Sequence, residues 1–198
     1  MTVTSLEQTS SDRITVHFDD GSELKSTLSA ITDTRLFSGK ELDLESYTEL
    51  KYLSEKYLAL NKAADILSRR LMSAKELQEK LLIKGYSEKT VIYCIEKMTG
   101  LGLINDEYYA SAIVRHYSAK SYGVGRIREE LHRRGIDREL WDDAIKEIPQ
   151  MDNKISSFIE SHLKDPTDKK QIKKVTDSLL RRGFSWEEIK SALREYEQ

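Results

Sequence analysis

The chain has 198 residues, of which 38% are hydrophobic and 33% are charged, and its net charge is −2. This length and apolar content suffice for a buried core, and no apolar stretch is long enough to span a membrane. No charged-then-apolar leader opens the sequence, and a single cysteine, Cys94, cannot form an internal disulfide. We therefore expect a cytoplasmic protein in which Cys94 is a core residue.

Residues 1–60 are predicted to form an N-terminal extension, a small β-hairpin followed by a helix. Apolar and polar side chains alternate over residues 14–18, the pattern resumes over residues 23–28, and Asp20-Gly21 between them is a hairpin turn signal. A hairpin alone is marginally stable in water, so this one should pack on another part of the chain.

A helical pattern begins at Leu44. Apolar residues recur at steps of three and four for about three heptads, at Leu50, Leu53, Tyr57, Leu60, Ala64, Leu67 and Leu71. Such a stripe fits either a coiled-coil dimer or a helix that packs on its own chain. The short length of the stripe favours the second interpretation, and we expect a monomer.

The rest of the chain repeats one pattern three times. A basic residue, a glycine, an apolar residue and a helix-capping residue recur as Lys84-Gly85-Tyr86-Ser87, Arg134-Gly135-Ile136-Asp137 and Arg182-Gly183-Phe184-Ser185. Apolar residues also lie eight and four positions before each glycine, and one, six and ten positions after it. The three sets are Leu77, Leu81, Tyr86, Val91 and Ile95; Ile127, Leu131, Ile136, Trp141 and Ile145; and Val175, Leu179, Phe184, Ile189 and Leu193. Agreement at five positions in three copies identifies an internal repeat.

Each copy is predicted to be two helices joined at the glycine. Spacings of four place the apolar residues on one helix face. The glycine ends the first helix in the left-handed conformation that a Cβ disfavours, and Ser87, Asp137 or Ser185 caps the second helix. Ser185 and Glu188 also have the spacing of a capping box.

A further helical stretch precedes each pair, with Asn105 and Asp152 as candidate N-caps in the second and third copies. The sequence therefore predicts an all-α fold of tandem three-helix repeats, residues 61–101, 102–149 and 150–198, in an elongated curved array after the N-terminal extension. Pro149 and Pro166 indicate a distinct joint, or a hinge, between the second and third repeats.

Charge is unevenly distributed. Residues 1–61 carry 6 basic and 11 acidic side chains, whereas residues 62–198 carry 26 and 23. Basic residues of the repeats cluster on the helix before the glycine. The candidate partner-binding residues among them are Arg126, Arg133, Arg134, Lys170, Lys173, Lys174 and Arg181. A solvated helix face explains such clusters by default, and the alternative is a surface for an acidic protein or a phosphate backbone.

No catalytic, cofactor or metal site is predicted. The four histidines lack metal-ligand spacing, and no local motif offers a nucleophile with a positioned base. Gly123-Val124-Gly125 has part of a phosphate-loop pattern, but a third glycine, a Gly-Lys-Ser/Thr segment and a preceding strand are missing, which favours a turn between helices. The sequence indicates a binding protein and not an enzyme.

Paired helices with a glycine turn also occur in helix-turn-helix DNA readers. The second helix of each pair is acidic or mixed here. Its acidic residues are Glu139, Asp142, Asp143 and Glu147 in the second repeat and Glu187, Glu188 and Glu195 in the third. Phosphates would repel such helices, so any DNA contact should be weak and independent of sequence.

Two segments resemble the RecX family of recombination regulators. The first repeat of that family is matched by Leu67-Ser68-Arg69-Arg70, Ser73, Glu76-Leu77, Leu81 and Gly85. Its most recognisable segment is matched by Ile104-Asn105-Asp106-Glu107-Tyr108-Tyr109-Ala110, Arg115, Gly123, Ile127, Glu130-Leu131 and Gly135-Ile136. The resemblance is strong over residues 60–148, lies more in pattern than in identity in the third repeat, and covers few individual positions before residue 60.

The resemblance implies a non-enzymatic regulator, mainly an inhibitor, of the RecA recombinase in DNA repair and the SOS response. RecX proteins are helical, bind the groove of the RecA–DNA filament, and restrain its growth, strand exchange, ATP hydrolysis and cleavage of the SOS repressor. The expected partners are this filament and, weakly and without sequence preference, single- or double-stranded DNA. The alternative is a non-specific DNA-binding helical module that acts by competing for DNA.

Overall fold

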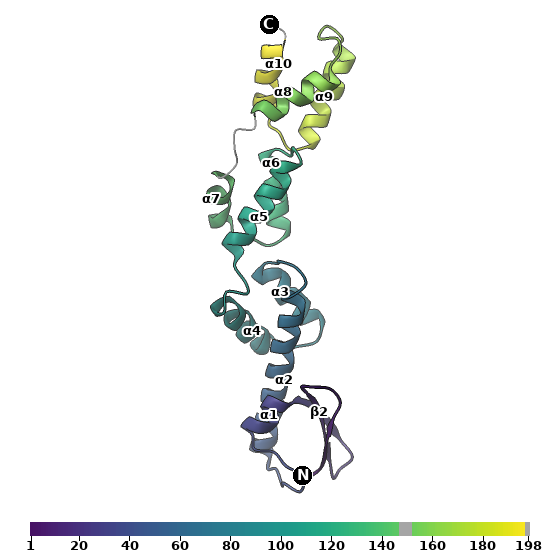
Figure 1. Cartoon of the computed structure of the whole chain (residues 1–198), viewed down its shortest axis with the longest axis vertical. Helices are drawn as coiled ribbons and strands as arrows, with labels where there is room; N and C mark the ends of the chain where they lie inside the picture. The colour runs from purple at the N-terminus through teal and green to yellow at the C-terminus, as the bar shows by residue number, and fades with distance from the viewer. Residues whose placement is uncertain (147–151, 197–198) are drawn as a thin grey trace. The chain divides into compact units, whose positions relative to one another are not determined.

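The computed structural model describes residues 1–146 and 152–196 (Figure 1). The chain divides into two compact units, one made of Met1–Leu71 and Leu77–Ile104, the other of Met72–Glu76 and the chain from Asn105 onward. The division runs through α3 (Ala74–Ile83), whose first residues belong to the second unit. The hinge predicted at Pro149 lies outside the described residues. Asp152 is the first residue of α8, and its side chain, predicted to cap that helix, is not among those described.

The first unit opens with a three-stranded antiparallel sheet in the order β1-β2-β3, formed by β1 (Val3–Gln8), β2 (Arg13–Phe18) and β3 (Glu23–Thr27). Strands β2 and β3 are the predicted hairpin, and Gly21 in their turn has a φ of 81°. The prediction of a two-stranded hairpin was incomplete, because β1 pairs with β2 as a third strand. Val3 is its one buried residue, so the segment lacks the alternation of a half-buried strand.

The sheet packs on α1 (Leu28–Asp33) and α2 (Leu44–Leu67), as Figure 1 shows, which confirms that the hairpin does not stand alone. Val16 and Phe18 of β2 share a core with Ile31 of α1 and Leu50 of α2. Both helices start at a side-chain cap. Thr27 Oγ1 accepts a hydrogen bond from the amide of Ala30 (3.2 Å), and Asp43 Oδ1 accepts one from the amide of Ser46 (2.8 Å).

Helix α2 begins at Leu44 as predicted, but it ends at Leu67 and buries a different face. Its buried residues are Leu50, Ser54, Ala59 and Ala63, and of these only Leu50 belongs to the predicted stripe. Small side chains suit this face because it packs between β3 and α4 (Glu88–Gly100). The Ser54 hydroxyl is satisfied by the Ser26 hydroxyl at 2.8 Å.

The three repeats are present, as predicted. Their paired helices are α3 and α4; α6 (Val124–Arg133) and α7 (Trp141–Lys146), with a 3-10 turn at Arg138–Leu140; and α9 (Lys169–Arg181) and α10 (Trp186–Tyr196). In the second and third repeats α5 (Asp106–Ala119) and α8 (Asp152–His162) precede the pair, and Asn105 caps α5 by accepting a hydrogen bond from the amide of Tyr108.

All three repeat glycines are left-handed, which confirms the predicted caps. Gly85, Gly135 and Gly183 have φ angles of 86°, 68° and 87°. In each copy the amide after the glycine donates to the carbonyl five residues earlier, as in Ile136 to Leu131 (3.1 Å). This is the hydrogen bond of a Schellman cap, and it draws the apolar residue back onto the helix.

Of the three side chains predicted to cap the second helix of a pair, only Ser185 does so. Ser185 and Glu188 form the capping box, with hydrogen bonds of 3.2 and 2.6 Å. Ser87 and Asp137 precede their helices with extended backbone but make no side-chain capping bond. Ser87 is diverted because its hydroxyl bonds to that of Thr90 at 3.0 Å.

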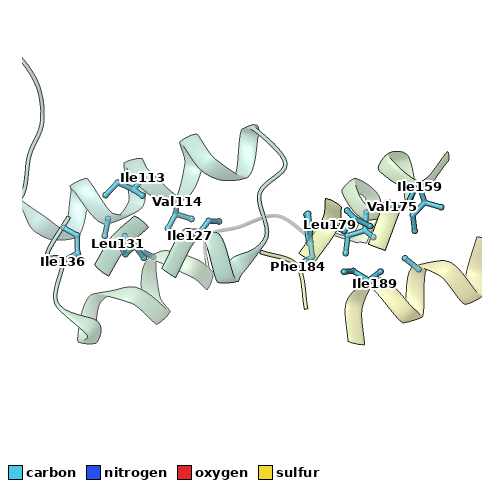
Figure 2. Close-up of a cluster of buried hydrophobic side chains, with 14 of the residues drawn as sticks. Ile113, Val114, Ile127, Leu131, Ile136, Ile159, Val175, Leu179, Phe184 and Ile189 are labelled. Carbon is cyan, nitrogen blue, oxygen red and sulfur yellow. The ribbon is translucent and has the colours of Figure 1, made fainter. Parts of the chain in front are cut away.

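The apolar positions before each glycine form the core, as predicted. Five of the six are completely buried, namely Leu77, Leu81, Ile127, Leu131 and Leu179. The sixth, Val175, is 4% exposed. Figure 2 shows the second and third repeats, where Ile127 and Leu131 gather with Ile113, and Val175 and Leu179 with Ile189. Cys94 is also buried, and burial raises the pKa of its thiol to about 11.

Candidate partner-binding surface

Helices α6 and α9 meet end to end through their backbones. The amides of Gly123 and Gly125, at the start of α6, donate to the carbonyls of Arg182 and Gly183, at the end of α9, at 2.8 and 2.9 Å. A Cβ on Gly123 would lie 2.4 Å from the carbonyl carbon of Gly183. Gly123-Val124-Gly125 therefore links helices, as predicted, and both glycine amides are already bonded.

A second contact between a helix start and a helix end joins the first turn of α3 to the end of α6, within the second unit. The Ser73 hydroxyl donates to the carbonyl of Arg134 at 2.5 Å, and the amide of Ala74 donates to Asp106 Oδ1 at 3.0 Å. A Cβ on Gly135 would meet the side chain of Lys75. Thus the first turn of another helix packs against two of the three cap glycines, Gly135 and Gly183. No such contact is present among the described residues at Gly85, where nothing lies within 4 Å of a hypothetical Cβ.

Glu130 anchors the cations at the end of α6. Its side chain is 2% exposed, and its carboxylate accepts hydrogen bonds from Arg133 Nε (3.0 Å) and Arg134 Nε (2.7 Å). Arg134 also donates to the hydroxyl of Tyr109. Hydrogen bonding from Arg133, joined by Arg134 and opposed by burial, lowers the pKa of Glu130 from 4.5 to about 2.

Replacing Glu130 by glutamine should destabilise the second unit by roughly 2–3 kcal/mol at pH 7, because a depressed pKa measures the stability that the charged form confers. The folded pKa lies below the unfolded one, so this stability is present above about pH 4.5 and is lost as the pH falls towards 2. Urea unfolding of both proteins at pH 7 and at pH 3 measures the difference.

The matched control is Glu129→Gln, since Glu129 is the adjacent residue and pairs with Arg126 on the surface at 2.7 Å. Exposed pairs contribute under about 1 kcal/mol, so this variant should unfold almost as the parent does. A Glu130→Gln deficit that is the same at both pH values would show that the ion pairs do not cause it.

The predicted cations of the second repeat are all paired. Arg126 bonds to Glu129, and Arg133 and Arg134 bond to Glu130. Arg134 is 21% exposed at its side chain, against 67% for Arg133. The structure thus gives Arg134 an internal role, which its spacing of four from Glu130 could have indicated.

The predicted cations of the third repeat differ, because they are exposed and unpaired. We call Lys170, Lys173, Lys174 and Arg181 of α9 the basic ridge. With Asp177 they line one shallow groove of about 400 Å³. None of the four forms an ion pair with a side chain of residues 1–146 or 154–196. The ridge is therefore a free patch of positive charge.

Helix α9 holds the ridge rigidly. Asp168 caps it by accepting hydrogen bonds from the amides of Lys170 and Gln171, at 2.8 and 3.3 Å. Its opposite face buries Val175 and Leu179 in the core. Because a packed helix presents the ridge, a partner would meet side chains on a preformed backbone.

Metal and membrane sites are absent from the described residues. No three His, Cys, Asp or Glu side chains there are placed to hold a metal ion. Nor does any helix among these residues combine the length and apolar character needed to cross a bilayer.

Three family models match the chain, one for each repeat. The first, second and third three-helix domains of RecX match residues 59–98, 105–145 and 161–193. The regulatory protein RecX of Caldanaerobacter subterraneus subsp. tengcongensis is 30% identical over 155 residues, which are 78% of this chain and 79% of that protein. The chain belongs to the RecX family. The resemblance read from residues 60–148 is thereby confirmed, and it extends to the third repeat.

Other RecX proteins agree. The regulatory protein RecX of Bacillus subtilis is 28% identical and covers 100% of this chain and 77% of its own length. A crystal structure of a regulatory protein RecX superposes with a TM-score of 0.70 at 25% identity, covering 96% of this chain and 98% of that one. RecX from Lactobacillus salivarius gives a TM-score of 0.66 at 28% identity, over 71% and 96%. The RecX regulatory family is non-enzymatic. The repeat boundaries predicted at residues 61, 102 and 150 stay predictions.

Proposed function

We propose that this chain is an inhibitor of the RecA recombinase that binds the RecA–DNA filament, and that the basic ridge is its main contact. Membership of the RecX family supports the choice of partner. The observation that carries the choice of surface is the unpaired charge of the ridge, since each candidate cation of the second repeat is already paired with Glu129 or Glu130.

Binding alone accounts for inhibition. A helical body seated in the filament groove blocks access to the DNA and restrains the protomers that it touches, so growth of the filament, strand exchange, ATP hydrolysis and cleavage of the SOS repressor all slow. The cations of the ridge would meet acidic side chains of the filament or phosphates of its DNA. The binding free energy of such a contact comes mainly from complementary charge and little from the burial of apolar surface.

The recombinase ATPase on single-stranded DNA tests this proposal. Titration with the full chain should lower the steady-state rate to a plateau, and added salt should weaken the effect because it screens the ridge. The same titration with recombinase lacking DNA is the control. A rate that stays constant at all concentrations of the chain would contradict the proposal.

A further inference from the structure

A pocket of about 370 Å³ lies between α8 and α9, beside the basic ridge. Phe158 and His162 of α8 form one wall, Val175 lies in the core beneath, and Lys174 and Arg181 of the ridge lie at the opposite side. An apolar wall with a few polar groups at its edge is the usual composition of a ligand site, and this volume is within the usual range. We call it the ring pocket.

The wall of the ring pocket is a stack of flat groups. The rings of Phe158 and His162 are parallel, with centroids 4.0 Å apart and planes 13° apart. The guanidinium carbon of Arg182 lies 5.0 Å from the Phe158 ring and 5.9 Å from that of Tyr122, so the series begins in the second repeat. His162 is the exposed member of the Phe158–His162 pair.

The orientation of His162 is fixed within its own helix. Its Nδ1 is 2.9 Å from the carbonyl oxygen of Phe158 and 2.7 Å from the hydroxyl of Ser161. A ring held in this way offers a stacking surface at little cost in side-chain entropy. Arg182 in turn is held at the end of α9, where its carbonyl accepts the hydrogen bond from Gly123.

We propose that the ring pocket binds one nucleotide of single-stranded nucleic acid, with the base stacked on the face of His162 that Phe158 does not cover and a phosphate against Lys174 and Arg181. Aromatic side chains beside a basic groove are the means by which proteins hold single strands without reading their sequence. Lys170 and Lys173 extend the positive charge beyond the pocket, where the next phosphates would lie. Bases in a duplex are already stacked and cannot enter.

An acidic peptide is the competing occupant. It would satisfy the cations equally well, but its carboxylates would leave the ring wall unused. The rings therefore favour a nucleotide over an acidic peptide. A nucleic-acid probe that has the phosphates but lacks the bases distinguishes the two. The inference goes beyond regulation of the recombinase, because the pocket should act with no recombinase present, and either proposal can fail without the other.

Fluorescence anisotropy of the full chain tests the ring pocket with two labelled probes of equal length, an oligothymidylate and its abasic counterpart. The oligothymidylate should bind about tenfold more tightly, which is within the range for one stacked base. His162→Ala should abolish this difference while leaving binding of the abasic probe unchanged. His162→Phe, which keeps a ring, should restore it.

Lys190→Gln is the matched control, because Lys190 is an exposed cation of α10 outside the pocket, and it should leave the tenfold difference unchanged. Equal affinity for the two probes would overturn the proposal and leave only the charge of the ridge. A preference for thymidylate that survives His162→Ala would overturn it as well. Displacement of the thymidylate by polyglutamate at matched charge would assign the pocket to an acidic protein segment. Thermal melting of each variant confirms that it is folded.

Discussion

Alanine at Gly183 should destabilise the protein by about 3–4 kcal/mol, more than alanine at either of the other two cap glycines. All three positions have positive φ, so each alanine incurs the left-handed strain of roughly 1–2 kcal/mol. At Gly183 the new Cβ would also lie 2.2 Å from the backbone nitrogen of Arg126. Helix α6 would have to move away from α9, and the hydrogen bonds from Gly123 and Gly125 would be lost at about 1 kcal/mol each.

Gly135 and Gly85 are the matched controls because they share the cap and differ in what the Cβ meets. At Gly135 the new Cβ would lie 2.3 Å from Cδ and 2.8 Å from Cβ of Lys75. The outer atoms of Lys75 can rotate away but its Cβ is fixed to the backbone of α3, so a loss between those at Gly85 and Gly183 is expected. At Gly85 no atom lies within 4 Å, so only the strain remains. Hydrogen exchange in the native state reports the loss separately for each unit. Equal losses at all three glycines would show that the joint between α6 and α9 contributes no stability.

The repeat could be predicted because its signals are local. A glycine in a left-handed cap, an apolar residue that folds back, and apolar spacings of four all lie within about twenty residues of chain. Gly135 with Leu131 and Ile136 illustrates this, since one Schellman cap joins them. Membership of the RecX family could be predicted for the same reason, because the order and spacing of these positions along the chain are what the family shares.

The parts that the sequence could not supply depend on distant partners. The joint between Gly123 and Gly183 requires two helices to meet, and neither glycine alone indicates it. Strand β1 forms because β2 offers it an edge, although the strand itself is mostly exposed. Ser54 is buried in α2 because Ser26 satisfies its hydroxyl. Within the candidate site, the spacing of Glu130 from Arg134 indicates an ion pair, but the burial of Glu130 depends on how α6 packs in the second unit.

Reversing the charge of Lys170 and Lys173 should weaken binding to the RecA–DNA filament by about tenfold or more. Both side chains are exposed and unpaired, so Lys170→Glu with Lys173→Glu should leave the fold intact. At the interface each change replaces an attraction by a repulsion, and like charges in contact are strongly unfavourable. Neither residue lines the ring pocket, so their reversal should leave unchanged the contribution of base stacking on His162, which the abasic probe isolates.

The matched control reverses two exposed cations of α10, Lys190 and Arg194, which lie in the same repeat but outside the ridge. It changes the net charge equally, so a general loss of steering towards a charged partner would appear in both variants. Arg134 is unsuitable as a control, since its reversal would leave Glu130 buried beside a like charge and would disturb the fold.

The affinity of the full chain for the RecA filament on single-stranded DNA, measured beside its affinity for the same DNA without recombinase, tests the central claim most directly. The parent and the α10 variant should bind the filament at least about tenfold more tightly than the bare DNA, and the Lys170→Glu, Lys173→Glu variant should lose most of that preference. Equal affinity of the parent chain for filament and bare DNA, or a preference that survives reversal of the ridge, would contradict it.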